Sequence, residues 1–350
     1  MRTSKSATVA RRTVVCTVAA ALAAAMGVSV AAQRNGAAGQ GGGAAGQGGA
    51  RGGARGGAEG RGTHILERAT TERAVPLPKS KLDQYFKDMD AAHEETLRMV
   101  EGGQFNVNIR RIKKPEAAPL IHPKTIDVWY VLEGSGSVTT GGTLANGTVT
   151  GGTTDRLSAG DVEFIPANLP HWVSEVGSGG ITWLNVRWDV DWKGPMGAGN
   201  PPVPGVPGSA GVGEYATPGK AVYIPKALLE SYIAEQNSTK STSQTKRMIE
   251  GGHFNVNIRN ITEPSVEFHE RTIDTWVVLQ GSGTAVTAFS TASGDAHVEP
   301  VRGNPRLPNT GVEAPMKVGD VMFVPSNMTH GFSKVDGRMV WLNIRWDSNY

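Results

Sequence analysis

The sequence predicts an all-β protein that consists of two tandem copies of one domain, each preceded by a short α-helix. Three observations lead to this prediction. The same phrases recur in the same order in both halves of the chain. Within each copy, apolar and polar residues alternate with a period of two, which is typical of half-buried strands. Ahead of each strand region, apolar residues instead recur at helical spacing.

The N-terminus is predicted to be a secretory signal peptide over residues 1–32. Basic residues precede the apolar run TVVCTVAAALAAAMGVSVAA, and small residues end it near Ala31 and Ala32. This is the order found in secretory signals, with an uncleaved N-terminal anchor as the alternative. No other run approaches the ~20 apolar residues that a membrane span needs. We therefore expect an exported protein, periplasmic or extracellular, with no membrane span in the mature chain.

Residues 33–62 are predicted to be a disordered tether, because this Gly/Ala-rich segment offers almost no apolar side chain to bury. The single cysteine, Cys16, lies in the signal, so the mature chain has no disulfide, thiolate ligand or cysteine nucleophile. The formal charge of +3 is misleading, because the signal carries four positive charges and the tether a net three. Residues 63–350 carry about −4, which gives no basic surface for nucleic acid.

An internal duplication organises the rest of the chain. The matching segments are 74–85 with 221–232, 101–110 with 250–259, 121–136 with 268–283, 157–172 with 316–331, and 182–189 with 340–347. We predict an N-terminal domain over 74–192 and a C-terminal domain over 221–350, joined by a Pro/Gly-rich linker over 193–220. The two copies are expected to pack as a pseudo-symmetric pair, and further oligomerisation stays open.

The elements of each copy follow from spacing. Apolar residues at helical intervals predict one helix within 79–100, and a shorter helix is predicted over 226–236. The segment QFNVNIRRI alternates apolar Phe105, Val107 and Ile109 with polar residues, which predicts a strand. Further strands are predicted at VWYVLEGSGSV, GDVEFIP and ITWLNVRWD and at their counterparts in the second copy.

The first of two motifs in each copy resembles that of the cupin superfamily. The family has two His two residues apart, a Glu five residues after the second His, and then a strand such as YVLEGSG. At these places the chain has Leu120, His122 and Asp127 in one copy and Glu267, His269 and Asp274 in the other. The second His is thus kept, the Glu is shortened to Asp, and the first His is absent.

The second cupin motif runs Gly, five residues, Pro, one residue, Gly, two residues, His. It matches at Gly160, Pro166, Asn168 and His171, and again at Gly319, Pro325, Asn327 and His330. Asn replaces the second Gly in both copies, and we expect it to adopt the left-handed backbone conformation that the turn requires. The resemblance implies two tandem cupin double-stranded β-helix (jelly-roll) domains, each preceded by a short α-helix.

The resemblance also implies a divalent transition metal (Fe, Mn, Zn or Ni) in each barrel. Two His and a carboxylate suit such an ion and leave coordination sites open. The expected ligands are His122, Asp127 and His171 in the first copy and Glu267, His269, Asp274 and His330 in the second. Glu267 and His269, two apart on a strand, can face the same barrel, whereas Leu120 cannot ligate. The alternative is structural His residues in a barrel that has lost its metal.

A second set of residues are candidates for binding a substrate. Asn and Arg residues at every second position share one strand face in each copy, and the arginines are Arg110, Arg187, Arg259 and Arg345. If this face lines the barrel, an Arg would suit a carboxylate substrate, because its planar fork pairs with carboxylates bidentately. The alternative is a solvated or inter-domain face. Trp129 and Trp276, two residues after each Asp, are either pocket walls or plain core.

Three functions fit these features. The first is an exported metal-dependent cupin enzyme, an oxygenase, decarboxylase or isomerase, acting on a small organic acid, polyol or phenolic ligand. The alternatives are a non-catalytic ligand-binding protein of the cell envelope and a structural cupin with no functional metal. Copy two has a donor at Glu267 and a longer insert over 287–315 that is a candidate lid. We therefore predict that copy two is the active or higher-affinity site.

Overall fold

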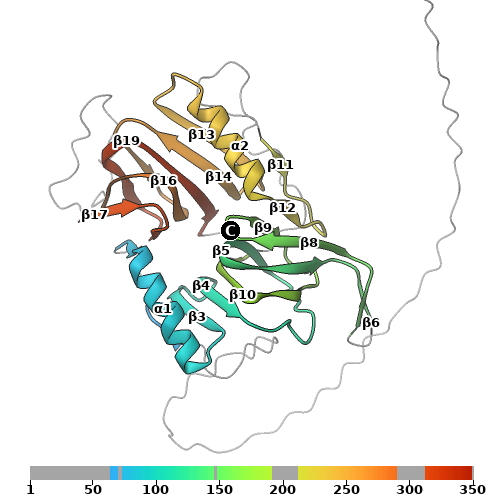
Figure 1. Ribbon diagram of the computed structural model, residues 1–350. Coiled ribbons are helices and arrows are strands. Elements are labelled where there is room, and N and C mark those ends of the chain that lie inside the picture. The colour runs from blue at the N-terminus through green and yellow to red at the C-terminus, as the bar shows by residue number, and fades with distance from the viewer. Residues whose placement is uncertain (1–63, 70–72, 146–147, 191–211, 290–311, 349–350) are drawn as a thin grey trace, which may run out of the picture. The chain divides into compact units, whose positions relative to one another are not determined.

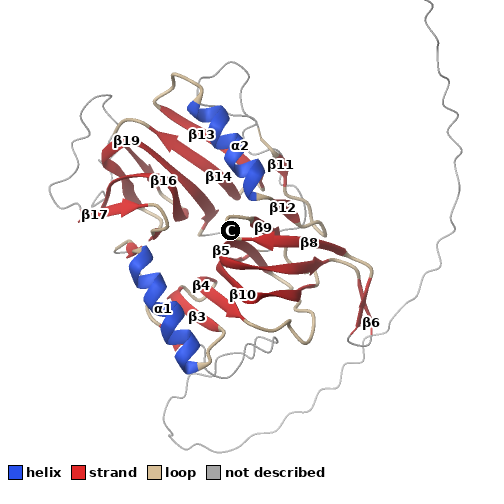
Figure 2. Ribbon diagram, in the orientation of Figure 1, coloured by secondary structure: helices blue, strands red, loops and turns tan. Residues whose placement is uncertain are grey.

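The computed structural model of the 350-residue chain describes residues 64–69, 73–145, 148–190, 212–289 and 312–348. The predicted signal and tether lie outside the described residues, as do residues 290–311 of the candidate lid. Strands dominate the described segments, which contain two helices besides (Figure 2). No helix in these segments is long and apolar enough to cross a membrane. The all-β prediction is confirmed.

The first sheet contains eight strands (Figure 1). Its order is β1 (His64–Ile65), β3 (Thr96–Glu101), β4 (Phe105–Ile112), β10 (His171–Asp189), β5 (Thr125–Thr140), β9 (Val162–Ile165) and β12 (Val222–Ile224). β8 (Thr153–Ser158) pairs with β5 off this path, and β6 (Thr143–Ala145) and β7 (Thr148–Thr150) form a separate two-stranded sheet.

The second sheet contains nine strands in the corresponding order. They are β11 (Glu214–Tyr215), β13 (Ser243–Glu250), β14 (Phe254–Ile261), β19 (Met328–Asp347), β16 (Thr272–Phe289), β18 (Val321–Val324) and β2 (Val75–Leu77). β15 (Ser265–His269) pairs with β19, and β17 (Val312–Lys317) pairs with β16. The shared order confirms two tandem jelly-roll domains. The boundaries at 74–192 and 221–350 stay a prediction.

Helices α1 (Lys79–Ala92) and α2 (Lys226–Asn237) each begin after a proline, Pro78 or Pro225. Proline suits this place because its fixed φ leads into a helix. The predicted helical pattern across residues 79–100 is too long. His93 adopts φ 56°, a left-handed conformation that ends α1, and Thr96 to Glu101 form β3 instead. The buried residues of β3 pack in the sheet and merely resemble a continued helical stripe.

The two halves exchange strands. β2 precedes the first helix in sequence but pairs with β18 of the second sheet, while β12 precedes the second helix but pairs with β9 of the first sheet. Each exchange ends in a hydrogen bond at a helix N-terminus. The backbone N–H of Lys79 donates to Asp320 over 2.7 Å, and that of Lys226 donates to Asp161 over 2.6 Å. An acidic group at this end satisfies an open N–H and complements the helix dipole.

One hydrophobic core is common to both sheets, and each barrel has a second, separate core. Aromatic rings from both halves meet in the common core. Trp188 stacks on Trp346 with centroids 5.2 Å apart and an interplanar angle of 7°. Phe105 meets Phe323 at 5.7 Å, and the equivalent pair of Phe164 and Phe254 lies 5.6 Å apart. The opposite sheet faces are therefore left to line the two barrels.

Candidate metal centres

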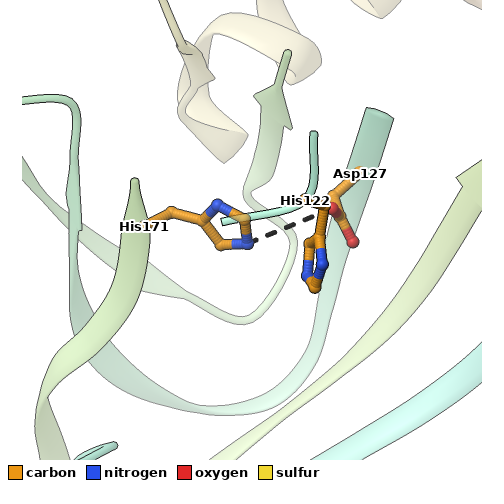
Figure 3. Close-up of side chains that lie close together, drawn as sticks. All are labelled: His122, Asp127 and His171. Carbon is orange, nitrogen blue, oxygen red and sulfur yellow. Dashed lines mark ion pairs between the residues drawn. The ribbon is translucent and has the colours of Figure 1, made fainter. Parts of the chain in front are cut away.

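The first candidate centre contains His122, Asp127 and His171. One ligand atom from each lies within 4.8 Å of the others. Asp127 lies on β5 and His171 begins β10, so neighbouring antiparallel strands present them to the same interior. Figure 3 shows the His171 ring turned toward Asp127, with Nε2 of His171 4.0 Å from Oδ2 of Asp127. The three residues that the motif predicts therefore converge.

The turn before His171 orients its ring. Asn168 has φ 63°, and its N–H donates to the His122 carbonyl over 2.8 Å. Nδ1 of His171 lies 2.8 Å from the Leu169 carbonyl, so Nδ1 carries the proton and Nε2 faces the centre. Asn327 has φ 60° at the equivalent turn. The prediction that Asn adopts the left-handed conformation in both motifs is confirmed.

The second candidate centre brings together Glu267, His269 and His330, with one ligand atom of each within 4.8 Å of the others. β15 places Glu267 directly opposite His330 of β19. Oε1 of Glu267 lies 3.5 Å from Nε2 of His269 and 3.8 Å from Nε2 of His330. Asp274, fully buried, lies outside this group of three but has Oδ2 3.1 Å from Nε2 of His330.

Glu267 has no counterpart in the first barrel. Leu120 stands at that position and pairs with His171 through backbone hydrogen bonds only. The first centre therefore has three converging donors, and the second has three, with Asp274 beside His330 as a fourth candidate.

Each carboxylate of these centres is paired with an arginine. Nε of Arg187 lies 2.8 Å from Oδ1 of Asp127. In the second barrel Nε of Arg345 lies 2.7 Å from Oδ1 of Asp274, and Nη2 of Arg259 lies 3.6 Å from Oε2 of Glu267. The Asn/Arg face therefore lines the barrels, and these arginines contact carboxylates of the chain itself.

Glu116 is a residue that the sequence reasoning missed. Its Oε1 accepts a hydrogen bond from Arg110 over 2.7 Å, and its Oε2 accepts from the Val173 N–H over 2.8 Å. Arg110 thus finds in Glu116 the partner that Arg259 finds in Glu267. The available signal was slight: an acidic residue in a segment that is two residues longer than its counterpart.

The charges keep these carboxylates ionised. Burial by itself raises the pKa of Asp127, but Arg187 and the two histidines outweigh it and hold the pKa below its usual value. Burial also raises the pKa of Glu267. Arg259, His269 and Arg345 lower it by more, so its pKa falls well below the usual value. For His330, burial lowers the pKa but the adjacent Asp274 carboxylate raises it overall.

The donor atoms fit a divalent metal. Nε2 of His269, Nε2 of His330 and Oδ2 of Asp127 are buried without a hydrogen bond of normal geometry in the described segments, and each lies nearest to another donor of its own centre. Such atoms are costly to bury unless something else binds them. Imidazole nitrogen and carboxylate oxygen together suit first-row divalent ions. The side chains therefore fit such an ion, and its ligation by the predicted residues stays a prediction.

Trp129 and Trp276 are both core residues and neighbours of the centres. Each is buried in the interior core of its own barrel. The Trp129 ring lies 6.0 Å from that of His171, and the Trp276 ring lies 5.6 Å from that of His330. The two interpretations of these residues are therefore compatible.

Comparisons with known proteins find similarities to one family model and to several solved structures. A family model described as "Cupin" matches residues 85–184. Salicylate 1,2-dioxygenase from Pseudaminobacter salicylatoxidans is similar in structure, with a TM-score of 0.50 and 14% identity over 79% of this chain and 85% of that chain. The putative glyoxylate-induced protein from Pseudomonas aeruginosa gives 0.45 and 16% over 83% and 95%. Among curated proteins, none matches.

Proposed function

We propose that the chain, whose residues 85–184 match the cupin family model and whose two sheets share one strand order, is a two-domain cupin that binds a divalent transition metal and acts on a small organic acid. The second barrel is the higher-affinity centre. One observation carries the proposal: Glu267, His269 and His330 converge within 4.8 Å, and Asp274 lies 3.1 Å from His330. Two imidazoles and two carboxylates that gather in one barrel interior exceed what a structural His requires.

The charge of the centre favours an anionic ligand. Glu267 and Asp274 are each matched by an arginine, Arg259 or Arg345. The protein groups are therefore close to neutral as a set, so a divalent ion leaves the centre positive. A positive centre inside a barrel attracts an organic acid more strongly than a neutral polyol.

The roles of the chain follow from its geometry. The imidazoles and carboxylates would hold the metal, which supplies Lewis acidity and a template for the bound acid. Arg345 and Arg259 keep Asp274 and Glu267 ionised and fixed in place. Trp276 excludes water beside His330, since its buried ring lies 5.6 Å away.

Elemental analysis tests the centre. We would compare the purified full chain with the His330→Ala and His171→Ala variants. The proposal expects metal in the wild type and a larger loss from His330→Ala than from His171→Ala. Equal metal in all three would refute the assigned ligands. Loss from His171→Ala alone would reverse the order of the two barrels, and a wild type that resists reconstitution would favour a non-catalytic or structural cupin.

A turnover screen tests the reaction. Small organic acids, salicylate among them, would be offered to protein loaded with Fe(II) or Mn(II), with polyols and phenols as the neutral comparison. Turnover of an acid by the wild type and its loss in His330→Ala support an enzyme. Binding of an acid without turnover supports a ligand-binding protein instead.

Export is part of the proposal and rests on the sequence of residues 1–32 alone. N-terminal sequencing of the protein from the producing cells checks it. A mature N-terminus close to residue 33 is the expected result, and a protein that retains Met1 would support the uncleaved anchor.

A further inference from the structure

Glu163 lies on β9, the second strand from one edge of the first sheet. On β9 it is directly opposite Trp129 of β5 on one side and Tyr223 of β12 on the other. Residues directly opposite each other in an antiparallel sheet present their side chains to the same face. Glu163, Trp129 and Tyr223 therefore form one row. The neighbours Val162 and Phe164 belong to the core shared with the second domain and mark the opposite face.

The face that carries Glu163 is the interior of the first barrel. Asp127 and Trp129 are two apart on β5, so the candidate metal ligand and the indole share this face. The Trp129 ring lies 6.0 Å from the His171 ring and 4.7 Å from the Trp183 ring. Glu163 is therefore directly opposite Trp129, whose ring lies beside His171 of the first centre.

The carboxyl group of Glu163 has no evident structural purpose. The residue is fully buried, and neither carboxyl oxygen has a hydrogen-bond partner among the described residues. Burying such a group without a partner costs free energy. The second barrel holds Met322 at the equivalent position, opposite Trp276. The fold therefore accepts an apolar side chain here, and the acid is not needed to form the sheet.

The chemistry of this interior is that of hydrogen-bond donors. Burial, with the nearby carboxylates Asp155 and Asp161, raises the pKa of Glu163 well above its usual value. A neutral carboxyl group can donate its O–H. The indole Nε1 atoms of Trp129 and Trp183 are also buried without an acceptor in the described part of the chain. Three donors without acceptors thus line one barrel interior.

We propose that Glu163 is a ligand-binding acid of the first barrel, whose O–H donates a hydrogen bond to an oxygen atom of a small organic acid held beside the His122, Asp127 and His171 centre. The indole N–H groups of Trp129 and Trp183 complete the set of donors. The ligand class rests on the function proposed above, and Glu163 adds a specificity determinant that only the first barrel has. The two barrels then differ in chemistry: the first recognises acceptor oxygens through Glu163, and the second relies on its additional metal donor, Glu267.

The test uses the full chain in a His269→Ala background, which weakens the second centre, loaded with Mn(II). Glu163→Gln and Glu163→Met are compared with the parent, and Met322→Leu is the matched control in the second barrel. The probes are salicylate and salicyl alcohol, which differ in the carboxylate. Infrared spectroscopy follows the carbonyl stretch of a protonated carboxyl group, and thermal melting follows stability.

We expect salicylate affinity to fall roughly tenfold to a hundredfold in Glu163→Met, the range for a hydrogen bond to a charged group. Glu163→Gln should fall less, because its amide still donates. Affinity for salicyl alcohol should change little. The melting temperature of Glu163→Met should equal or exceed that of the parent, and the protonated-carboxyl band should be absent from Glu163→Gln. Met322→Leu should leave salicylate affinity unchanged.

Equal salicylate affinity in the parent and Glu163→Met would overturn the inference, as would a parent that fails to bind salicylate. A lower melting temperature in Glu163→Met with unchanged affinity would assign Glu163 a structural role. The metal content is measured on the same samples. Absence of metal refutes the proposed centre. Normal metal content, with the same salicylate affinity in the parent and the Glu163 variants, refutes this inference alone.

Discussion

In the second barrel, Nε of Arg345 lies 2.7 Å from Oδ1 of the fully buried Asp274. The first barrel repeats the pair with Arg187 and Asp127 at 2.8 Å. Both arginines were sequence candidates for binding a substrate carboxylate. Each pairs with a carboxylate of its own barrel, and substrate binding by these arginines stays a prediction.

Removing one partner of this pair should destabilise the protein strongly. Arg345→Met leaves the Asp274 carboxylate buried without its counter-charge, and we expect a loss of about 3–5 kcal/mol of unfolding free energy. Urea denaturation at neutral pH measures it. Lys334→Met, which removes an exposed ion pair with Asp336, is the control and should have a far smaller effect. Equal effects of the two variants would contradict a buried pair.

Glu267→Gln should weaken metal binding in the second barrel by at least roughly tenfold, because even changes to groups outside the ligand set commonly cost that much. Isothermal titration with Mn(II) measures the two sites. Glu116→Gln is the matched control: Glu116 pairs with Arg110 as Glu267 pairs with Arg259, but it lies outside the converging groups. A comparable loss of affinity in Glu116→Gln would show that the ion pair, not ligation, matters.

Much of this architecture could be predicted from the sequence because duplication repeats every local signal twice. The strands follow from alternation, and the convergence of His122, Asp127 and His171 follows from motif spacing. Asn168 was predictable because few residues besides Gly tolerate positive φ. These features depend on residues close together in the chain.

Features that depend on distant segments were not predictable. Nothing near Val75 indicates that β2 pairs with the second sheet, and nothing near Arg187 indicates which carboxylate it contacts. The helical spacing continues through Thr96 and Met99, which are buried by a sheet instead, so the pattern predicts a helix that is too long. In the sequence, Glu163 appears only as one residue of a predicted strand. Its difference from Met322 gains meaning once the register places it opposite Trp129.

The left-handed turn at Asn327 should discriminate between substitutions. Asn327→Gly should be nearly neutral, whereas Asn327→Ala should lose about 1 kcal/mol, because Ala at φ 60° keeps the Cβ but lacks the polar side chain that lets Asn hydrogen-bond locally in this conformation. Thermal denaturation compares the two. Since the Asn327 N–H donates to the His269 carbonyl over 2.8 Å, the Ala variant should also weaken metal binding. An Ala variant as stable as Gly would argue against the strained turn.

Acid should weaken the attachment of α1 to the first sheet through Asp90. Its carboxylate accepts two hydrogen bonds of 3.0 Å from Arg111 of β4. Hydrogen bonds from Arg111 and then Lys113 lower the pKa of Asp90 from 3.8 to about 2. Because the folded pKa is the lower one, the stabilisation is present above about pH 3.8 and is lost as the pH falls toward 2.

Asp90→Asn should therefore lower the free energy of unfolding at neutral pH. Between pH 4 and 2, the variant should lose less of this free energy than the wild type does. The effect should stay below about 1 kcal/mol, because the Asp90 side chain is 35% exposed and solvent screens the pair. Denaturation midpoints at several pH values measure it. Parallel pH curves for the variant and the wild type would contradict this assignment.

The shared aromatic core should make the two domains unfold together. Trp346 of the second sheet stacks on Trp188 of the first and also meets Phe105 at 5.6 Å. Trp346→Ala removes a large buried side chain, so we expect a loss of about 3–5 kcal/mol. Because the lost contacts belong to both halves, hydrogen exchange should rise in β4 and β10 as well as in β14 and β19. The reciprocal pairing of β2 and β12 leads to the same expectation, since neither sheet keeps all its strands if the other unfolds.

Val138→Ala, in the core of the first barrel alone, is the control and should act mainly on that barrel. Faster exchange confined to the second sheet in Trp346→Ala would mean that the domains are stable independently.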